Sequence, residues 1–178
     1  MFQEILKFWF EEIKPKQWWV KDSALDQLII DRFFEIHPKA ARCELFSWRE
    51  RAEGRLAEII VLDQFSRNMF RDTPLSFAYD SLALALAQEA ISIGADQSLS
   101  PTERNFIYMP FMHSESLQIH EAAVELFRRN GQQGNLDYEF KHKDIIEKFG
   151  RYPHRNDILD RESTAEEIEF LQQPGSRF

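Results

Sequence analysis

The sequence contains little cysteine and no long apolar run. Cys43 is the only cysteine among 178 residues, so no intrachain disulfide can form, which suits a reducing compartment. Charged residues interrupt the N-terminal segment before a signal-peptide core is complete. No apolar run approaches the roughly 18 residues needed to span a bilayer. We therefore expect a cytoplasmic protein with no membrane partner.

Blocks of basic residues and glycine-rich phosphate loops are also missing. The chain has 22 Lys and Arg against 30 Asp and Glu, which gives a formal net charge of −8 at pH 7. General nucleic-acid binding depends on basic side chains that neutralise phosphates. We therefore expect no nucleic-acid partner.

Glycine is scarce as well, and its positions indicate helix ends. Of only 6 glycines, Gly94, Gly131 and Gly150 each follow a segment with apolar residues at helical spacing, as helix-terminating glycines do. No segment combines β-branched alternation with a hairpin dipeptide. These features predict an all-α fold of about eight or nine helices, joined by short loops that favour antiparallel neighbours. We expect a single helical domain over residues 1–172 and a frayed tail over residues 173–178.

The segment 48–71 is predicted to form the central helix. An S-x-x-E capping pattern precedes it at Ser47 and Glu50. Its apolar residues form two stripes, and a helix that is apolar on more than one side is covered on most sides by the rest of the fold. The stripes comprise Leu56, Ile59, Ile60 and Phe70 on one side and Leu62, Phe65 and Met69 on the other.

Polar side chains interrupt both stripes. Asp63 and Arg67 stand four residues apart, as do Gln64 and Asn68, so each pair is expected to share a helix face. A buried carboxylate or guanidinium costs several kcal/mol unless it is paired. We therefore expect other parts of the chain to supply partners around this helix.

Further boundaries follow from capping patterns and proline. Ser100-Pro101-Thr102-Glu103 predicts the start of a helix, and Pro110 should kink or stop that helix. Ser163-Thr164-Ala165-Glu166 predicts a second capping box. Cys43 lies in an apolar stretch and is expected to fill the core.

Three segments place dense polar groups beside apolar ones: 63–68, 109–115 and 150–156. Pro110 and Pro153 free local backbone groups in the second and third segments and let side chains turn inward there. We expect the three segments to meet in space, because the polar groups of the first cannot stay buried without partners.

Arginine and histidine within these segments favour an anion site. Arg67, Arg151 and Arg155 can converge with His113 and His154, and the arginine fork suits carboxylate and phosphate. The carboxylates would orient these cations or act as acid or base. The expected ligand-binding residues are Gln64, Arg67, Asn68, Arg151, Arg155 and Asn156, and the candidates for acid or base catalysis are Asp63, His113, Glu115 and His154.

The same residues also allow a structural interpretation. The pairs Asp63–Arg67 and Glu115–Arg155 can close a buried salt-bridge network that holds helices together, and such networks resemble functional sites. Metal and nucleophile motifs are missing. His113-x-Glu115 and His154 lack an H-E-x-x-H or cysteine-pair pattern, and no G-x-S-x-G elbow occurs. We expect no metal site and no cofactor.

Several long strings resemble a known family. LDQFSRNMF, FAYDSLALA, YMPFMHSES and KHKDIIEKFGRYPHRNDILDREST, together with the N-terminal ILKFWF and QWWVKD, are similar to the bacterial domain-of-unknown-function family 924. The resemblance spans nearly the whole chain and implies an all-helical, TPR-like fold, but no reaction. The function we expect is binding of a small anionic metabolite in a polar pocket. The alternative is a protein- or peptide-interaction scaffold, because TPR-like helix pairs often form concave recognition surfaces.

Overall fold

Helices make up all the regular secondary structure of residues 1–176, the part of the chain that the computed structural model describes. The all-α prediction is confirmed. The α-helices are α1 (Phe2–Lys7), α2 (Ser23–Phe33), α3 (His37–Ala41), α4 (Ala52–Ile60), α5 (Ser66–Met69), α6 (Asp80–Ser92), α7 (Pro101–Met112), α8 (Leu117–Asn130), α9 (Gln133–Phe149) and α10 (Ala165–Leu171). Shorter π or 3-10 turns are η1 (Phe8–Glu12), η2 (Pro15–Trp19), η3 (Phe46–Glu50), η4 (Val61–Phe65), η5 (Pro74–Ser76), η6 (Ala95–Ser98) and η7 (Pro153–Arg155).

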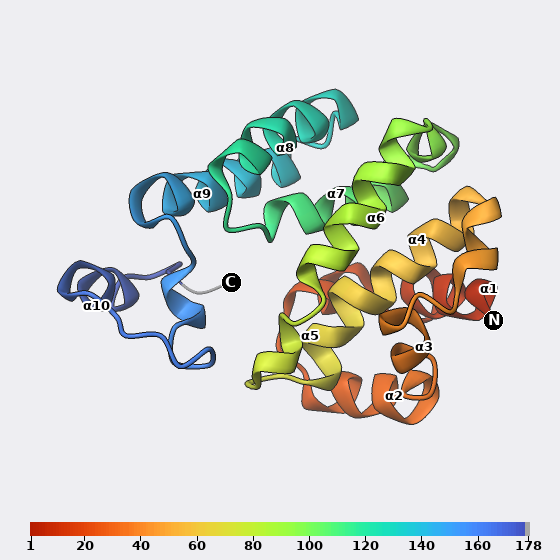
Figure 1. Cartoon of the computed structure of the whole chain (residues 1–178), viewed down its shortest axis with the longest axis horizontal. Helices are drawn as coiled ribbons and strands as arrows, with labels where there is room; N and C mark the ends of the chain where they lie inside the picture. The colour runs from red at the N-terminus through yellow and green to blue at the C-terminus, as the bar shows by residue number, and fades with distance from the viewer. Residues whose placement is uncertain (177–178) are drawn as a thin grey trace.

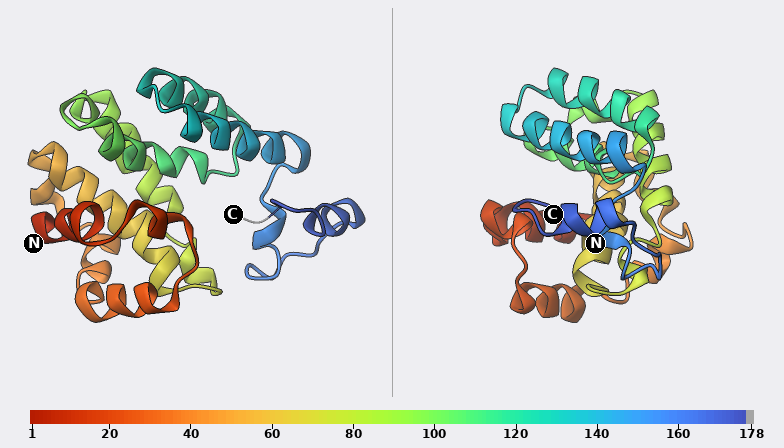
Figure 2. Two further views of the ribbon diagram at one scale, coloured as in Figure 1. Left: turned by 180° about the vertical axis from the view of Figure 1, so that it is seen from behind. Right: turned by 90° about the vertical axis from the view of Figure 1, so that its left-hand side faces the viewer.

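Helices α6 to α9 pack as neighbours in the order in which they follow one another in the chain. α6 contacts α7, α7 contacts α8, and α8 contacts α9. Figure 1 shows these helices beside the group formed by α1 to α5, with α10 at the far end of the molecule. The left view in Figure 2 shows the same separation of α10 from the N-terminal helices. This order of neighbours is compatible with a TPR-like array. No helix of the described residues is long and apolar enough to span a bilayer.

The glycines predicted to end helices do so. Gly94, Gly131 and Gly150 have φ values of 73°, 77° and 67°, which place them in the left-handed region where glycine ends many helices. They follow α6, α8 and α9.

The predicted central helix lies at the centre of the core. α4 packs against α1, α6 and α7, while η4 packs against α3 and α6. Its apolar stripes are confirmed as core, because several of their side chains have no exposed surface. These fully buried residues are Leu56, Ile59, Ile60, Leu62 and Phe65.

The predicted start of this helix at Ser47 was wrong. Ser47 lies within η3, and Arg51 is extended, with φ −124° and ψ 144°, before α4 begins at Ala52. The reason is a close approach: a Cβ on Gly54 would lie 2.1 Å from the carbonyl oxygen of Trp48. The chain therefore turns back onto the first turn of α4, and no side chain caps that helix.

A π turn lies in the middle of the central helix, and one of the two polar pairs expected four residues apart is formed. η4 joins α4 to α5 without a break in helical φ and ψ. Gln64 and Asn68, which were expected to share a helix face, do not bond to each other, because Gln64 donates to Asp63 and Asn68 donates to Asp26. Asp63 and Arg67 keep their four-residue contact across the same turn, at 3.2 Å.

The capping box at the start of α7 is confirmed. Glu103 N donates to Ser100 Oγ at 3.3 Å, and Ser100 N donates to Glu103 Oε2 at 2.9 Å. Pro110 does not stop this helix, which continues to Met112. So little helix follows the proline that its missing N–H affects only the last turn.

The capping box before α10 is shifted by one residue from the prediction. Glu167 N donates to Thr164 Oγ1 at 3.2 Å, and Thr164 N donates to Glu167 Oε2 at 2.8 Å. Ser163 is engaged elsewhere, because its Oγ accepts from Asn156 Nδ2 at 3.0 Å. Within the expected frayed tail, Ser176 Oγ donates to Leu171 O at 3.2 Å; residues 177–178 lie outside the described residues.

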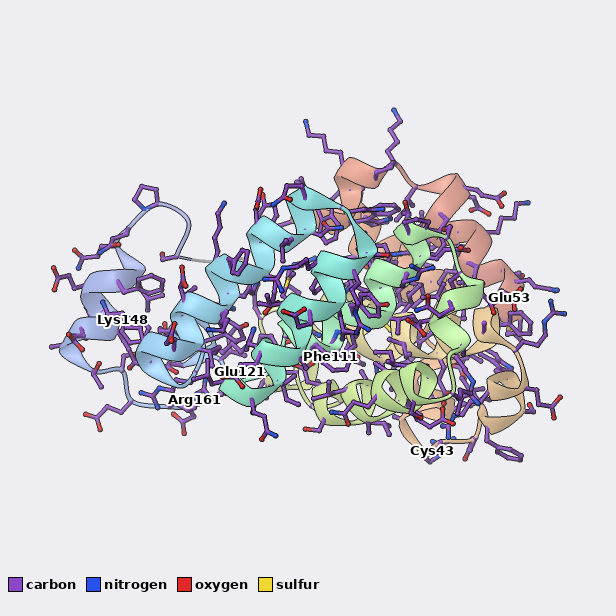
Figure 3. All side chains as sticks on the ribbon, turned by 90° about the horizontal axis from the view of Figure 1, so that it is seen from above. Cys43, Glu53, Phe111, Glu121, Lys148 and Arg161 are labelled. Atoms are coloured by element: carbon purple, nitrogen blue, oxygen red, sulfur yellow. The ribbon has the colours of Figure 1, made fainter. Side chains whose placement is uncertain are left out.

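The prediction that Cys43 fills the core was wrong. Cys43 is exposed and has a φ of 58°, and it lies at the periphery of the molecule in Figure 3. The apolar neighbours Leu45 and Ala40 take the buried positions instead. The chain turns sharply at the cysteine, so its side chain leaves the face that these neighbours share.

Candidate functional site

Asp63 lies at the centre of a buried polar cluster. Its Oδ1 accepts from His113 Nδ1 at 2.7 Å and lies 3.2 Å from an Arg67 terminal nitrogen, while its Oδ2 accepts from Gln64 Nε2 at 2.6 Å. Burial raises the pKa of Asp63, but the imidazole of His113, the guanidinium of Arg67 and the Gln64 amide together lower it to about 2. Asp63 is therefore ionised at neutral pH.

His113 is held by this carboxylate in one orientation. Burial and then the positive charge of Arg67 lower the pKa of His113, so the ring is neutral at pH 7. The Nδ1–H must donate to Asp63, because an ionised carboxylate only accepts. Nε2 then carries a lone pair, has no hydrogen-bond partner among the described residues, and belongs to a side chain that is 12% exposed.

Arg67 bridges two carboxylates. Its terminal nitrogens donate to both oxygens of Asp80 at 2.9 and 3.0 Å, and one of them also donates to the Asp63 backbone oxygen at 2.7 Å. Asp80 opens α6. Asp80 was not among the residues predicted from the sequence, although an acidic residue at the start of an apolar helix inside the FAYDSLALA string was an available signal.

Arg155, which lies in the third polar segment, also pairs with Asp80. It donates to Asp80 Oδ2 at 3.2 Å and to the backbone oxygen of His113 at 2.9 Å. The rings of Phe77 and Tyr152 each lie 4.6 Å from its guanidinium carbon, a cation–π arrangement on two sides. Burial and then repulsion from Arg67 lower the pKa of Arg155, but a guanidinium stays charged in proteins.

The Asp63 cluster therefore draws on all three polar segments. We give this name to Asp63, Arg67, Asp80, His113 and Arg155. The expected convergence of Arg67 with His113 and Arg155 is seen in the contacts above. Two arginines face two aspartates in it, so the formal charges cancel while His113 is neutral.

Other predicted site residues lie outside this cluster. Arg151 pairs with Glu167 at 2.7 and 2.8 Å. Asn156 Nδ2 donates to Ser163 and Glu167, and Asn68 Nδ2 donates to Asp26. The ring of His154 lies 5.5 Å from that of Tyr152.

The predicted pair between Glu115 and Arg155 is not formed. Glu115 instead pairs with Arg161 at 2.7 and 3.0 Å and accepts from the backbone N–H of Tyr152 at 2.7 Å. Burial raises the pKa of Glu115, but the hydrogen bonds from Arg161 and Tyr152 outweigh it and lower that pKa. Arg155 is turned toward Asp80, which leaves Glu115 to the arginine six residues further along the chain.

A second buried group fastens the third segment to α8 and α9. His120 Nδ1 lies 2.7 Å from Glu139 Oε1, and both side chains are fully buried. Tyr152 Oη donates to Met112 O at 2.5 Å and lies 3.2 Å from His120 Nε2. Burial raises the pKa of Glu139. His120 is thus a packed residue rather than part of the Asp63 cluster.

The described hollows of the surface lie elsewhere. One of about 490 Å³ lies against α10, and one of about 220 Å³ lies along α1. Neither is lined by a residue of the Asp63 cluster. Among residues 1–176, no group of three or more His, Cys, Asp or Glu side chains is arranged to hold a metal ion.

Comparison with known proteins supports the resemblance. The family model described as "Bacterial protein of unknown function (DUF924)" matches residues 5–175. A solved structure of a protein of unknown function, ATU0120 from Agrobacterium tumefaciens, is similar with a TM-score of 0.92 and 43% identity over 97% of each chain. No curated protein matches the chain.

Proposed function

The chain belongs to the bacterial family DUF924, whose description names no reaction, and from its own geometry we propose that it binds a small anionic metabolite at the Asp63 cluster. His113 is the group that exchanges a proton with the ligand. Arg67 and Arg155 recognise the anionic part. The proposal includes a cytoplasmic location.

One observation carries the proposal: Asp63 holds His113 in one orientation, and the His113 side chain reaches the surface. Its Nδ1 is fixed by Asp63, a carboxylate with only 1% of its side chain exposed. A carboxylate that orients an imidazole is a common arrangement for a general base, because it leaves the other nitrogen free to accept a proton. Nε2 is the only one of the two ring nitrogens without a partner among the described residues.

The arginines beside it support an anion as ligand. Arg67 and Arg155 both reach the same carboxylate, that of Asp80, so two guanidinium groups face one anionic position. The side chains of Arg67 and Asp80 are 20% and 18% exposed. The position is therefore within reach of solvent.

Thermal unfolding in the presence of anionic metabolites tests the proposal. A ligand that binds the native state alone raises stability, by about 2.7 kcal/mol at 100 times its dissociation constant. The response should vanish in His113→Gln and Arg67→Ala. It should persist in Arg42→Ala, because Arg42 pairs with Glu44 on the open surface. A panel of carboxylates, phosphates and nucleotides that leaves the wild-type midpoint unchanged would contradict the proposal.

A second candidate is an interaction scaffold in which the cluster is structural. Every arginine of the cluster already meets a carboxylate of the chain itself, as expected for a network that pins helices together. Exposed apolar side chains such as Trp19, Phe46 and Ile93 offer contact area for a protein or peptide. This candidate is favoured if no anion changes the unfolding midpoint of the wild type.

A further inference from the structure

Asp80 differs from the other carboxylate of the Asp63 cluster in how it meets the arginines. Both of its oxygens lie against the two terminal nitrogens of Arg67, at 2.9 and 3.0 Å, and one of them also accepts from Arg155 at 3.2 Å. Two parallel N–H···O bonds from one guanidinium are the geometry in which arginine commonly binds a carboxylate, whether the carboxylate belongs to the same chain or to a ligand.

We infer that the Asp80 carboxylate occupies the position of the ligand's anionic group, so that binding proceeds by exchange of Asp80 for a carboxylate of the ligand. The inference rests on the proposed function and names the class of ligand. The incoming group must present two oxygens in one plane to Arg67 and accept a further hydrogen bond from Arg155.

The surroundings of the two aspartates explain why Asp80 is the one to exchange. Asp63 lies inside the central helix, and only 1% of its side chain is exposed. Asp80 lies at the first turn of α6 and follows a short connecting segment whose residues 72–75 are exposed. Its side chain is 18% exposed. A small rotation of this side chain toward solvent would free both arginines without opening the core.

Charge balance favours a monoanionic carboxylate over a dianion. With Asp80 turned away, Arg67 and Arg155 carry two positive charges against the single negative charge of Asp63. One further negative charge restores neutrality in a poorly solvated site, where unbalanced charge is costly. The rings of Phe77 and Tyr152 each lie 4.6 Å from the guanidinium carbon of Arg155. The N–H groups of a guanidinium point outward in its plane, which suits the planar fork of a carboxylate.

The test compares wild type with Asp80→Asn, titrated with acetate at constant ionic strength and followed by NMR. Asparagine keeps the shape of the side chain and removes the competing charge. We expect acetate to bind Asp80→Asn at least about tenfold more tightly than wild type. Asp72→Asn is the matched control, because it makes the same change of charge at an exposed residue of the preceding segment. It should leave the affinity unchanged.

A measurement on the wild type keeps the inference open to refutation if Asp80→Asn does not fold. Acetate should shift the side-chain carboxyl carbon resonance of Asp80 and leave that of Asp63 in place. Equal acetate affinity in wild type and Asp80→Asn, or an unshifted Asp80 resonance in wild type at saturating acetate, would overturn the inference while the proposed anion site stands. Tighter binding of inorganic phosphate than of acetate by Asp80→Asn would overturn the assignment of a carboxylate. No response of either variant to any anion would overturn the proposed function as well.

Discussion

The two carboxylate oxygens of Glu115 accept hydrogen bonds from the two terminal nitrogens of Arg161, at 2.7 and 3.0 Å, although the two residues are 46 positions apart in the sequence. The same carboxylate accepts the backbone N–H of Tyr152 at 2.7 Å. It therefore ties two points of the segment after α9 to the loop that follows α7. The segment also supplies Arg155 to the Asp63 cluster, so the attachment at Glu115 helps to keep that arginine in place.

Glu115→Gln should loosen this attachment. The amide cannot form the charged pair with Arg161, and hydrogen bonds to charged groups are worth roughly 1.5–3 kcal/mol. We expect hydrogen exchange at the Tyr152 amide to become at least about tenfold faster, since each 1.4 kcal/mol is about a factor of ten. Glu147→Gln is the control, because that carboxylate is 59% exposed and lies 3.7 Å from Lys143. Equal protection in all three proteins would contradict the role given to Glu115.

Arg67→Ala should destabilise the protein in the absence of ligand. Removing one partner of a buried ion pair leaves the other uncompensated, and we expect a loss of about 3 kcal/mol in the free energy of unfolding. Urea unfolding at neutral pH measures it. Arg42→Ala removes the same side chain from an exposed pair with Glu44 and should change stability within error only. A similar loss of unfolding free energy in both variants would show that the Arg67 pair contributes no more to stability than an exposed ion pair.

Stability should fall as the solution is acidified below about pH 6.5. His37 is buried, and its Nε2 lies 2.8 Å from Ser66 Oγ, whose hydroxyl donates to Leu62 O at 2.6 Å. Burial lowers the pKa of His37 to about 4. As the solution is acidified, this histidine is therefore protonated in the unfolded chain before it is protonated in the folded one. The stabilising contribution is fully present above the ordinary pKa of about 6.5 and is lost as pH falls from about 6.5 to 4, by up to about 1.4 kcal/mol per pH unit.

The variant His37→Gln isolates this contribution. The unfolding free energy of the variant should depend less steeply on pH over the same window, because one fewer proton is taken up on unfolding. His142, whose pKa burial lowers to about 3, keeps its own contribution in both proteins. Asp63, with a pKa lowered to about 2, adds a loss only below about pH 3.8. An unchanged slope in the variant would mean that His37 titrates normally in the folded state.

Two glycine substitutions should have opposite effects. Gly54→Ala places a methyl group 2.1 Å from the backbone oxygen of Trp48, and overpacking against backbone should cost about 3 kcal/mol or more. Gly134→Ala lies in α9 with nothing within 4 Å of the new methyl group and should stabilise by about 0.5–1 kcal/mol. Thermal unfolding of both variants measures the difference. A well-folded Gly54→Ala of wild-type stability would refute the close approach of η3 to α4.

Sequence reasoning predicted what depends on local pattern and missed what depends on the path of the chain. The all-α fold and the capping box at Ser100 follow from spacing within a few residues. The start of the central helix was wrong, because Gly54 meets Trp48 only after η3 has folded back. The partners Asp80 and Arg161 were missed for the same reason.

The polar segments themselves were a different case. Their need for partners could be argued from burial, and Arg67, His113 and Arg155 do lie together around two carboxylates. The pairing of arginines with carboxylates joins residues that are far apart in the sequence. Arg67 and Asp80 are separated by 13 positions, and Arg155 and Asp80 by 75. Patterns within a few residues could not predict whether Arg155 pairs with Glu115 or with Asp80.

Because of the π turn at Val61–Phe65, the arrangement of the Asp63 cluster depends on the exact number of residues in the central helix. Such a turn holds one residue more than an α-helical turn of the same span, and each residue advances about 100° around the axis. Deleting a single residue between Ala52 and Asp63 would let the turn relax to an ordinary helix with no gap in the chain. Arg67 and Asp63 could then no longer both meet the partners that α6 and α7 present from fixed directions. Homologous chains that differ here in length by one residue should therefore differ in the cluster, even where every polar side chain is retained.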